Sequence, residues 1–215
     1  MPNTRLALLS TSYLPPIQYF SKFLYYEKVY IEIYENYQKQ SYRNRCVIYA
    51  ANGPLTLVVP VIKKQGVKTK ISDIKIDYSK SWQRMHWRSI VSAYKNSPFF
   101  EFFEEKFVHF YENNARFLVD LNMSLLKTVL EIFEVDTFPE FTKVYQIHGN
   151  FDDYRHSINP KKRLAKPDNL YEVVPYHQVF NEKFGFIPNL SIIDLLFNMG
   201  TESTSMLKNS IKKGI

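Results

Sequence analysis

The first 34 residues constrain the fold most strongly, because they read as two strands joined by a helix. The segment "RLALLS" is short and apolar and predicts a buried strand. Pro15 and Pro16 favour the first turn of a helix through "IQYFSKFLYY". The next segment, "KVYIEIY", places Val29, Ile31 and Ile33 at alternate positions, which is the period of a strand. Such a strand–helix–strand unit joins parallel strands with a right-handed crossover, so we predict an α/β fold.

Further strand and helix signals follow this unit. The runs "RCVIYA" and "LTLVVPVI" flank Asn52 and Gly53, which favour a hairpin turn, and "ISDIKID" alternates like another strand. From Ser81 onward three segments have helical spacing, and Pro98 marks the start of the second. In that second helix we expect one buried aromatic face, made by Phe99, Phe102, Phe103, Phe107, Phe110 and Tyr111. The sequence therefore predicts a mixed sheet packed by amphipathic helices, with an α+β fold as the alternative.

The last third of the chain has weaker periodicity. Residues 138–170 combine prolines with mixed charge and predict a long ordered loop, which marks a weak sub-region boundary within a single domain over residues 1–215. A helix is then expected to start near Pro188–Asn189 and to end at Gly200.

Composition limits the classes of function. The net charge of +7 suits an anionic partner such as phosphate, a nucleotide sugar, nucleic acid or acidic lipid, although a solvated basic surface would give the same total. The single cysteine, Cys46, excludes an intramolecular disulfide and a multi-cysteine zinc site. No apolar run is long enough to span a membrane, so we expect a cytoplasmic protein. The sequence has no glycine-rich nucleotide-binding motif and no metal-binding pattern, and it does not indicate a cofactor.

The segment "NYQKQSYRNR" (residues 36–45) is the first candidate binding site. It is cationic and amide-rich, and it follows the end of a predicted parallel strand, where α/β sheets commonly bind ligands. On an extended backbone Arg43 and Arg45 would share one face and could grip an anion. A solvated loop is the alternative. The candidate substrate-binding residues of this segment are Lys39, Gln40, Arg43, Asn44 and Arg45.

His86 and Asp194 are the candidate catalytic residues. His86 shares a helix face with Trp82, Ile90 and Ala93, and it could act as a general acid or base or as a packed core histidine. Asp194 lies in the apolar run "LSIIDLLF", where a charge is costly unless it is paired, so it is either a partner for catalysis or a structural carboxylate.

Four blocks, read together, resemble the WbqC-like family in the form found in Bacteroidetes-type bacteria. The blocks are "YLPPIQYFSK", "SYRNRCVI" with "ANGPLTLVVPV", "MHWRSIVSAYKNSPFFEFFEEKF" and "GFIPNLSIIDLLFNMG". Some members are associated with surface-polysaccharide (O-antigen) biosynthesis, which implies a bacterial transferase-like enzyme acting on an activated or amino sugar. The matching positions add Tyr13 and Tyr94 to the candidate substrate-binding residues.

One departure from the family bears on the chemistry. Many relatives carry a His-Gln-Pro run before Tyr-Leu-Pro, whereas this chain has Leu9, Ser10 and Thr11 there. If that histidine is catalytic, this chain binds a ligand without turning it over, as a non-catalytic or scaffold protein. Nucleic-acid binding is a third hypothesis, and no recognisable nucleic-acid-binding motif supports it.

Overall fold

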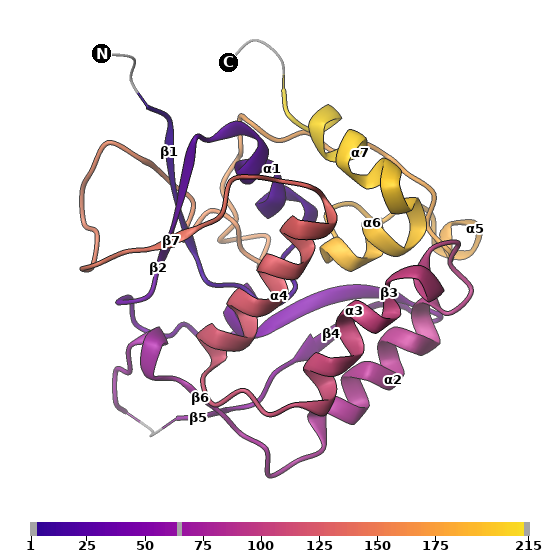
Figure 1. Cartoon of the computed structure of the whole chain (residues 1–215), viewed down its shortest axis with the longest axis horizontal. Helices are drawn as coiled ribbons and strands as arrows, with labels where there is room; N and C mark the ends of the chain where they lie inside the picture. Colours follow the sequence, from indigo (N-terminus) through magenta and orange to yellow (C-terminus); the bar gives the residue numbers. More distant parts are fainter. Residues whose placement is uncertain (1–3, 64–65, 213–215) are drawn as a thin grey trace.

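The predicted strand–helix–strand unit is present. The structure is a computed structural model that describes residues 4–63 and 66–212. In it β1 (Leu6–Ser10), α1 (Ile17–Tyr25) and β2 (Lys28–Glu32) follow one another, and the two strands pair in parallel from Leu6–Lys28 to Ser10–Glu32. Both strands stand near the N-terminus in Figure 1. The α/β class expected from the sequence is confirmed, with antiparallel hairpins beside the parallel sheet.

The predicted hairpin is also present. β3 (Arg45–Ala50) and β4 (Gly53–Val58) pair antiparallel around a turn in which Gly53 has a φ of 99°. The expected continuous strand stops at Pro60, and β5 (Val61–Ile62) pairs instead with β6 (Lys75–Ile76). The strand predicted over residues 71–77 is therefore short, because η2 (Ile71–Asp73) forms a 3₁₀ turn there.

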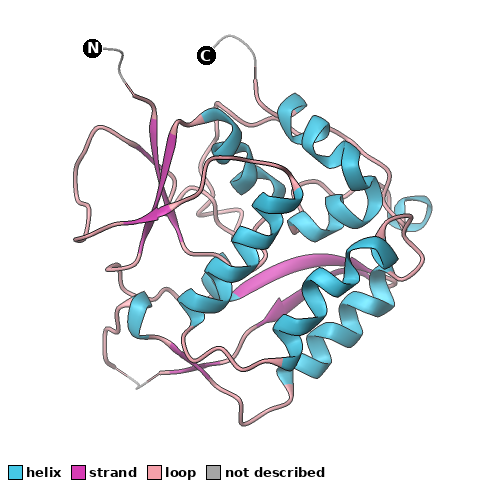
Figure 2. Cartoon of the chain, viewed as in Figure 1, coloured by secondary structure: helices cyan, strands magenta, loops and turns pink. Residues whose placement is uncertain are grey.

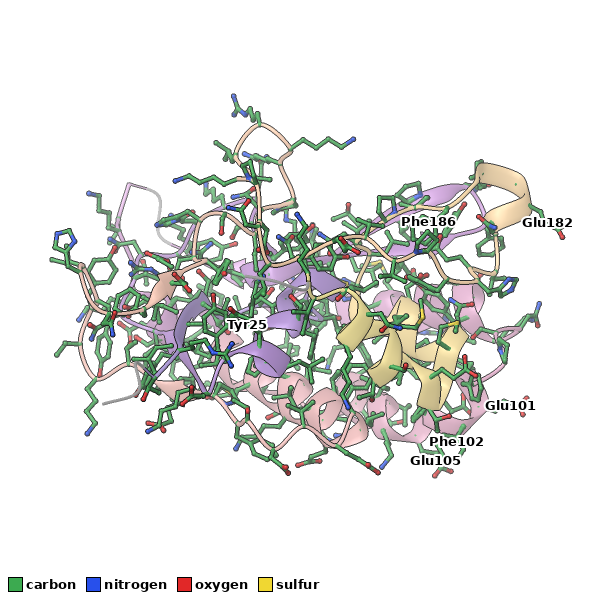
Figure 3. The ribbon with its side chains drawn as sticks, turned by 90° about the horizontal axis from the view of Figure 1, so that it is seen from above. Tyr25, Glu101, Phe102, Glu105, Glu182 and Phe186 are labelled. Atoms are coloured by element: carbon green, nitrogen blue, oxygen red, sulfur yellow. The ribbon has the colours of Figure 1, made fainter. Side chains whose placement is uncertain are left out.

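Three amphipathic helices cover the hairpin side of the molecule: α2 (Trp82–Tyr94), α3 (Phe100–Glu112) and α4 (Leu118–Ile132). The apolar stripe of α2, with His86 in it, is buried as predicted. The aromatic face of α3 is narrower than expected. Phe102 is 70% exposed and lies beside Glu101 and Glu105 at the outer surface (Figure 3). It lies off the buried face because the spacing of a helix places other residues there, namely Phe100, Phe103, Phe107 and Tyr111.

The C-terminal helices are α5 (Asn181–Phe184), α6 (Ile192–Met199) and α7 (Ser203–Asn209), with the 3₁₀ turn η3 (Gly200–Glu202) between the last two. α6 starts later than the sequence indicated. Asn189 has a φ of 55°, and Ser191 bridges to Pro16 instead of extending the helix. Gly200 ends α6, as predicted.

Gly200 gives a test of local packing. Its φ is 55°, and a Cβ at this position would overlap the ring of Phe99. We expect Gly200→Ala to lower the free energy of unfolding by about 2–3 kcal/mol, since it adds overpacking to backbone strain. Gly185→Ala is the matched control, because Gly185 has a φ of 73° and open space around it. Equal losses for the two variants in urea unfolding would show that Phe99 moves aside freely.

Residues 138–170 complete the parallel sheet. β7 (Glu140–Phe141) pairs with β2, and β8 (Asp152–Asp153) pairs with β1, giving the order β7-β2-β1-β8. The buried carboxylate of Glu32 holds this region in place, because it accepts hydrogen bonds from the Thr142 hydroxyl (2.9 Å) and the Gln146 main chain (2.8 Å). The ordered loop predicted from the sequence is thus anchored at the end of β2.

The two faces of the parallel sheet have different coverings. Ala7, Leu9, Val29 and Ile31 point into the main hydrophobic core, whereas Leu8 lies outside it. Figure 2 shows the α-helices gathered to one side of the β1–β2 pair, with loop segments on the other. Parallel sheets are usually covered by helices on both faces, so a face covered by loops is the unusual feature of this fold.

Candidate functional site

A polar cavity lies at the carboxyl end of the parallel sheet. Ser10, the last residue of β1, and the two residues after it, Thr11 and Ser12, form one wall. The 3₁₀ turn η1 (Tyr42–Asn44) and the segment after β8 form the others. The cavity measures about 10 Å³, which is room for about one water molecule. It is lined by Ser10, Thr11, Ser12, Tyr19, Tyr42, Arg43, Tyr154, Arg155 and Ile158.

Arg43 lines this cavity, but its guanidinium is paired with a carboxylate inside the protein. Its guanidinium donates to both carboxylate oxygens of Glu35, at 2.8 and 2.6 Å, and to the Ser10 hydroxyl at 2.6 Å. Both members of the ion pair are buried. The extended backbone expected for this segment is wrong, because η1 turns Arg43 inward and leaves Arg45 at the start of β3.

The other candidates of the segment separate into buried and exposed residues. Asn44 is buried, and its side-chain nitrogen donates to the Val59 carbonyl at 2.8 Å. The Nε of Arg45 is buried without a hydrogen-bond partner, whereas Lys39 and Gln40 are exposed. Gln40 has a φ of 57°, so the chain turns here before it reaches η1. Lys39 and Gln40 therefore lie at the surface just before η1 and do not line the cavity, whereas Arg43 forms part of its wall.

Arg155 is a site residue that the sequence did not single out. Its guanidinium donates to Asp153 at 2.6 Å, lies 3.5 Å from Glu32 and sits over the ring of Tyr145 at 5.2 Å. Its main-chain carbonyl accepts a hydrogen bond from Ser10. Asp153 is a near neighbour of Arg155, but the other partners of Arg155, Glu32 and Ser10, are distant in the sequence, so no local pattern marks it as a site residue. Ser10, Thr11 and Ser12 could have been found, since they lie at the end of the first strand.

A second buried ion pair anchors the far end of the segment after β8. The Lys22 ammonium of α1 lies 2.5 Å from the Asp168 carboxylate, and both side chains are buried. Burial lowers the pKa of Lys22. Residues 155–168 are thus fixed at Arg155 and at Asp168, and the part between these anchors carries the exposed cations Lys162, Arg163 and Lys166. Within residues 4–63 and 66–212, none of these three cations forms an ion pair.

His86 belongs to a separate buried network. The Tyr13 hydroxyl lies 3.0 Å from the His86 Nδ1 and 2.8 Å from the Tyr111 hydroxyl. Burial lowers the pKa of His86 to about 4, although a hydrogen bond with the main chain of Val58 opposes this shift. His86 is therefore neutral near pH 7, and it is not among the residues that line the polar cavity. Tyr13 connects the two places, because its main-chain N–H donates to the Tyr42 carbonyl at 2.9 Å.

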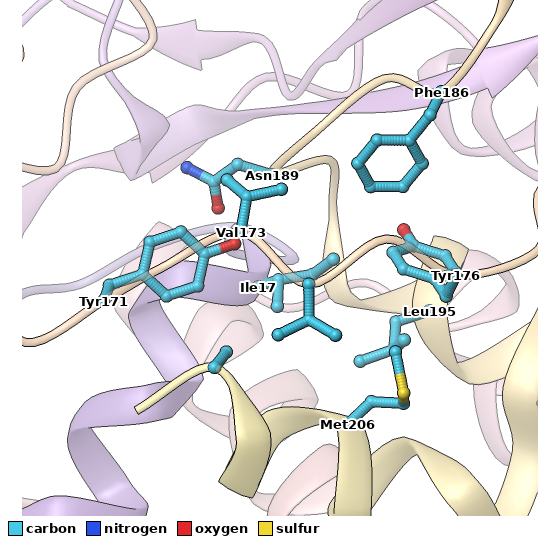
Figure 4. Close-up of a pocket in the computed structure, with 10 residues that line it drawn as sticks. Ile17, Tyr171, Val173, Tyr176, Phe186, Asn189, Leu195 and Met206 are labelled. Carbon is cyan, nitrogen blue, oxygen red and sulfur yellow. The ribbon is translucent and has the colours of Figure 1, made fainter. Parts of the chain in front are cut away.

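Asp194 has a network of its own. Its carboxylate accepts hydrogen bonds from the hydroxyls of Tyr94 (2.7 Å) and Tyr176 (2.5 Å) and from the amide of Gln178 (3.0 Å). Burial raises the pKa of Asp194, and these hydrogen bonds oppose the shift. Tyr176 also faces a small cavity beside Phe186 (Figure 4), which measures about 10 Å³ and has a mostly apolar lining without a charged side chain.

The candidates thus fall into three places. Arg43 lines the polar cavity, while His86 with Tyr13 and Asp194 with Tyr94 lie in separate networks; Lys39 and Gln40 are exposed and line none of these places. No group of His, Cys, Asp and Glu side chains suited to a metal ion occurs among the described residues. At the sheet edge the polar cavity has room for about one water molecule, and hydroxyl groups form much of its polar lining.

Comparison with known sequences supports the resemblance noted above. The profile of the WbqC-like protein family matches residues 11–164 and 169–206. The chain belongs to this family. The match covers β2, the hairpin and α2 to α4, and therefore most of the elements that carry the candidate residues.

A relative of similar length supports the same family-level conclusion. The protein named "Uncharacterized protein Rv1507c" from Mycobacterium tuberculosis (strain ATCC 25618 / H37Rv) is 23% identical over 229 residues, covering 95% of this chain and 97% of that protein. No solved structure matches the chain. Among the helices within residues 4–63 and 66–212, none is long and apolar enough to cross a membrane.

Proposed function

We propose that this protein is a cytoplasmic, transferase-like enzyme of bacterial surface-polysaccharide biosynthesis. Its substrate is an anionic activated sugar or amino sugar that binds at the polar cavity. The observation that carries this proposal is the position of that cavity. It lies beyond the carboxyl ends of β1 and β2, where α/β sheets bind ligands, and it is lined by hydroxyl groups.

The lining suits a sugar better than a bare anion. Arg43 and Arg155 are paired with Glu35, Glu32 and Asp153, so the wall has no excess of positive charge. The hydroxyls of Ser10, Ser12 and Tyr154 also line the cavity. They are hydrogen-bonded within the closed cavity, to Arg155 and Arg43, to Tyr42 and to Tyr26 respectively. In an opened cavity each can donate and accept, as sugar hydroxyls require. In many relatives a His-Gln-Pro run stands where this chain has Leu9, Ser10 and Thr11, which places the departure from the family at this wall.

The phosphate of an activated sugar would meet the cations after β8. Lys162, Arg163 and Lys166 are exposed between the anchors at Arg155 and Asp168. Ile158 of the same segment closes the cavity, whose present volume of about 10 Å³ excludes a sugar ring. Binding therefore requires Ile158 and the residues around it to move out of the cavity while the anchors at Arg155 and Asp168 hold.

His86 and Asp194 fit positioning roles in this proposal. The His86–Tyr13 hydrogen bond holds the chain just after Ser12, and Asp194 holds Tyr94, which in turn accepts a hydrogen bond from the Tyr49 main chain of β3 (3.1 Å). Neither side chain lines the cavity, so each would act through its neighbours.

Calorimetric titration with nucleotide sugars tests the proposal. We expect Lys162→Ala/Arg163→Ala to weaken binding about thirtyfold, because each of the two lost charge-assisted contacts to a phosphate is worth about 1 kcal/mol or more. Lys106→Ala/Lys127→Ala is the matched control, since both of those lysines are exposed on α3 and α4. Binding of a nucleotide sugar that both double variants retain in full would remove the 155–168 segment from the site.

A non-catalytic binding protein of the same fold is the second candidate. The observation that favours it is that His86 and Asp194 are both buried and occupied by internal hydrogen bonds. Incubation of the ligand found by titration with an acceptor sugar separates the two. Product formation supports the transferase, whereas tight binding without turnover supports the binding protein.

A further inference from the structure

A second cavity lies on the face of the parallel sheet that no helix covers. It is a partly open cavity between the β1–β2 pair and the crossing segment 140–151, and its volume of about 330 Å³ falls in the range of small-molecule sites. Leu8 and Tyr30 form its floor. The walls come from the crossing segment and are formed by Glu140, Phe141, Thr142, Lys143, Gln146 and Phe151.

The topology explains why this space exists. β7 and β8 pair with opposite edges of the sheet, so the ten residues between them must cross its outer face. A helix would fill that face with close-packed side chains, but this segment is irregular and is fixed at its start by Thr142 and Gln146, which bond to Glu32. The cavity is therefore a product of the fold itself rather than of one side-chain position.

The walls have the chemistry of a site for a flat ring. Three aromatic side chains, those of Tyr30, Phe141 and Phe151, surround the space above Leu8. Lys143 and Gln146 supply polar groups at the same walls, and within the described part of the chain Lys143 forms no ion pair. Aromatic faces stack on any base, and an amide can pair with its edge. We propose that this cavity binds a planar heteroaromatic ring of the nucleobase kind.

The strand register sets the direction of such a ligand. Leu8 pairs with Tyr30, and two residues further along the same face Ser10 pairs with Glu32. Leu8 belongs to the ring cavity and Ser10 to the polar cavity, so the two sites follow one another along β1. Arg155 lies between them, against Glu32 and over Tyr145. A base above Leu8 would therefore direct its attached sugar and phosphates toward the carboxyl edge.

This inference deepens the proposed function. Only the identification of the ring as the base of the activated-sugar donor rests on that function. The ring site itself depends on the aromatic walls. One wall is fixed by close packing: a Cβ on Gly149 would overlap the Phe151 ring, so the glycine lets that ring lie flat against the main chain. The wall is thus already formed without a ligand.

Saturation-transfer NMR with free nucleosides tests the ring site, because nucleosides lack the phosphates that the proposed function requires. We expect at least one of uridine, cytidine, adenosine and guanosine to bind the wild-type protein. Phe141→Ala and Gln146→Ala should each weaken that nucleoside about tenfold, in line with the loss of one stacked ring or one edge contact. Ile147→Ala is the control, since this residue is 69% exposed on the same segment and does not line the cavity.

The outcomes separate the two proposals. No binding of any nucleoside, or equal binding by wild type, Phe141→Ala and Gln146→Ala, overturns the ring site. If nucleotide sugars still bind and Lys162→Ala/Arg163→Ala weakens them, the proposed function survives that result. A third outcome is that nucleosides bind and Phe141→Ala weakens them, but nucleotide sugars bind no more tightly than nucleosides do. That outcome supports the ring site and contradicts the proposed function. Circular dichroism confirms folding, and Gln146→Ala carries the test if Phe141→Ala fails to fold.

Discussion

Replacing Arg43 by alanine is expected to lower the free energy of unfolding by about 3–5 kcal/mol, because it leaves a buried carboxylate without its partner. Glu35 is 4% exposed, and its ion pair with Arg43 has an N–O distance of 2.6 Å. The same guanidinium donates to Ser10 at the end of β1, so the substitution also loosens the wall of the polar cavity. Urea unfolding followed by far-UV circular dichroism measures the loss.

Two variants make this result specific. Lys39→Ala, in the same segment but exposed, should change stability by less than about 0.5 kcal/mol. Glu35→Ala/Arg43→Ala should lose less than the sum of the two single variants, because neither charge is then left unpaired. A loss below about 1 kcal/mol for Arg43→Ala would mean that water reaches Glu35, and the buried ion pair would then be a poor description of the site.

Asp194→Ala has the second large expected effect. The substitution leaves the buried hydroxyls of Tyr94 and Tyr176 and the amide of Gln178 without their shared acceptor. An unsatisfied buried polar group costs about 1–3 kcal/mol, so we expect a combined loss of about 3–5 kcal/mol once the groups partly rearrange. The measurement is urea unfolding at neutral pH, with the exposed Asp136→Ala as the control.

Asp194→Asn tests the charge rather than the hydrogen bonds. Burial raises the pKa of Asp194 above its ordinary value of 3.8, so the folded protein holds this proton more tightly than the unfolded chain does. The stabilisation from this proton is complete below the ordinary value and is lost as pH rises through the folded value. The free energy of unfolding of the wild type should therefore fall as pH rises through the folded value, relative to that of Asp194→Asn, because asparagine does not titrate. A constant difference would mean that the pKa is not raised.

Periodicity was sufficient to predict much of the fold. Three local signals predicted elements that are present in the structure. They are the alternation at Val29 and Ile31, the prolines at 15 and 16, and the turn at Asn52–Gly53, and each depends on interactions between near neighbours. The same holds for the buried stripe of α2 around His86. Helix and strand signals are local, so a single sequence carries them. The family blocks likewise depend on residue order alone, and the family is confirmed.

The candidate site depended on contacts that the sequence does not record. Arg43 and Arg45 alternate like residues on one face of a strand, yet η1 turned Arg43 toward Glu35. Arg155 reached the site because β8 joined β1 at the sheet edge, across about 140 residues of chain. A segment without periodicity, residues 138–170, turned out to supply both outer strands.

The sequence by itself determined the strand–helix–strand start of the chain with its two parallel strands, the hairpin at Asn52–Gly53 and the main amphipathic helices. The tertiary structure alone decided which charges are used up in buried pairs, and which face of the sheet stays uncovered. The physical reason is one of range. Secondary structure follows from neighbours a few residues apart, whereas a buried charge takes whichever distant partner the packed chain brings within hydrogen-bonding distance.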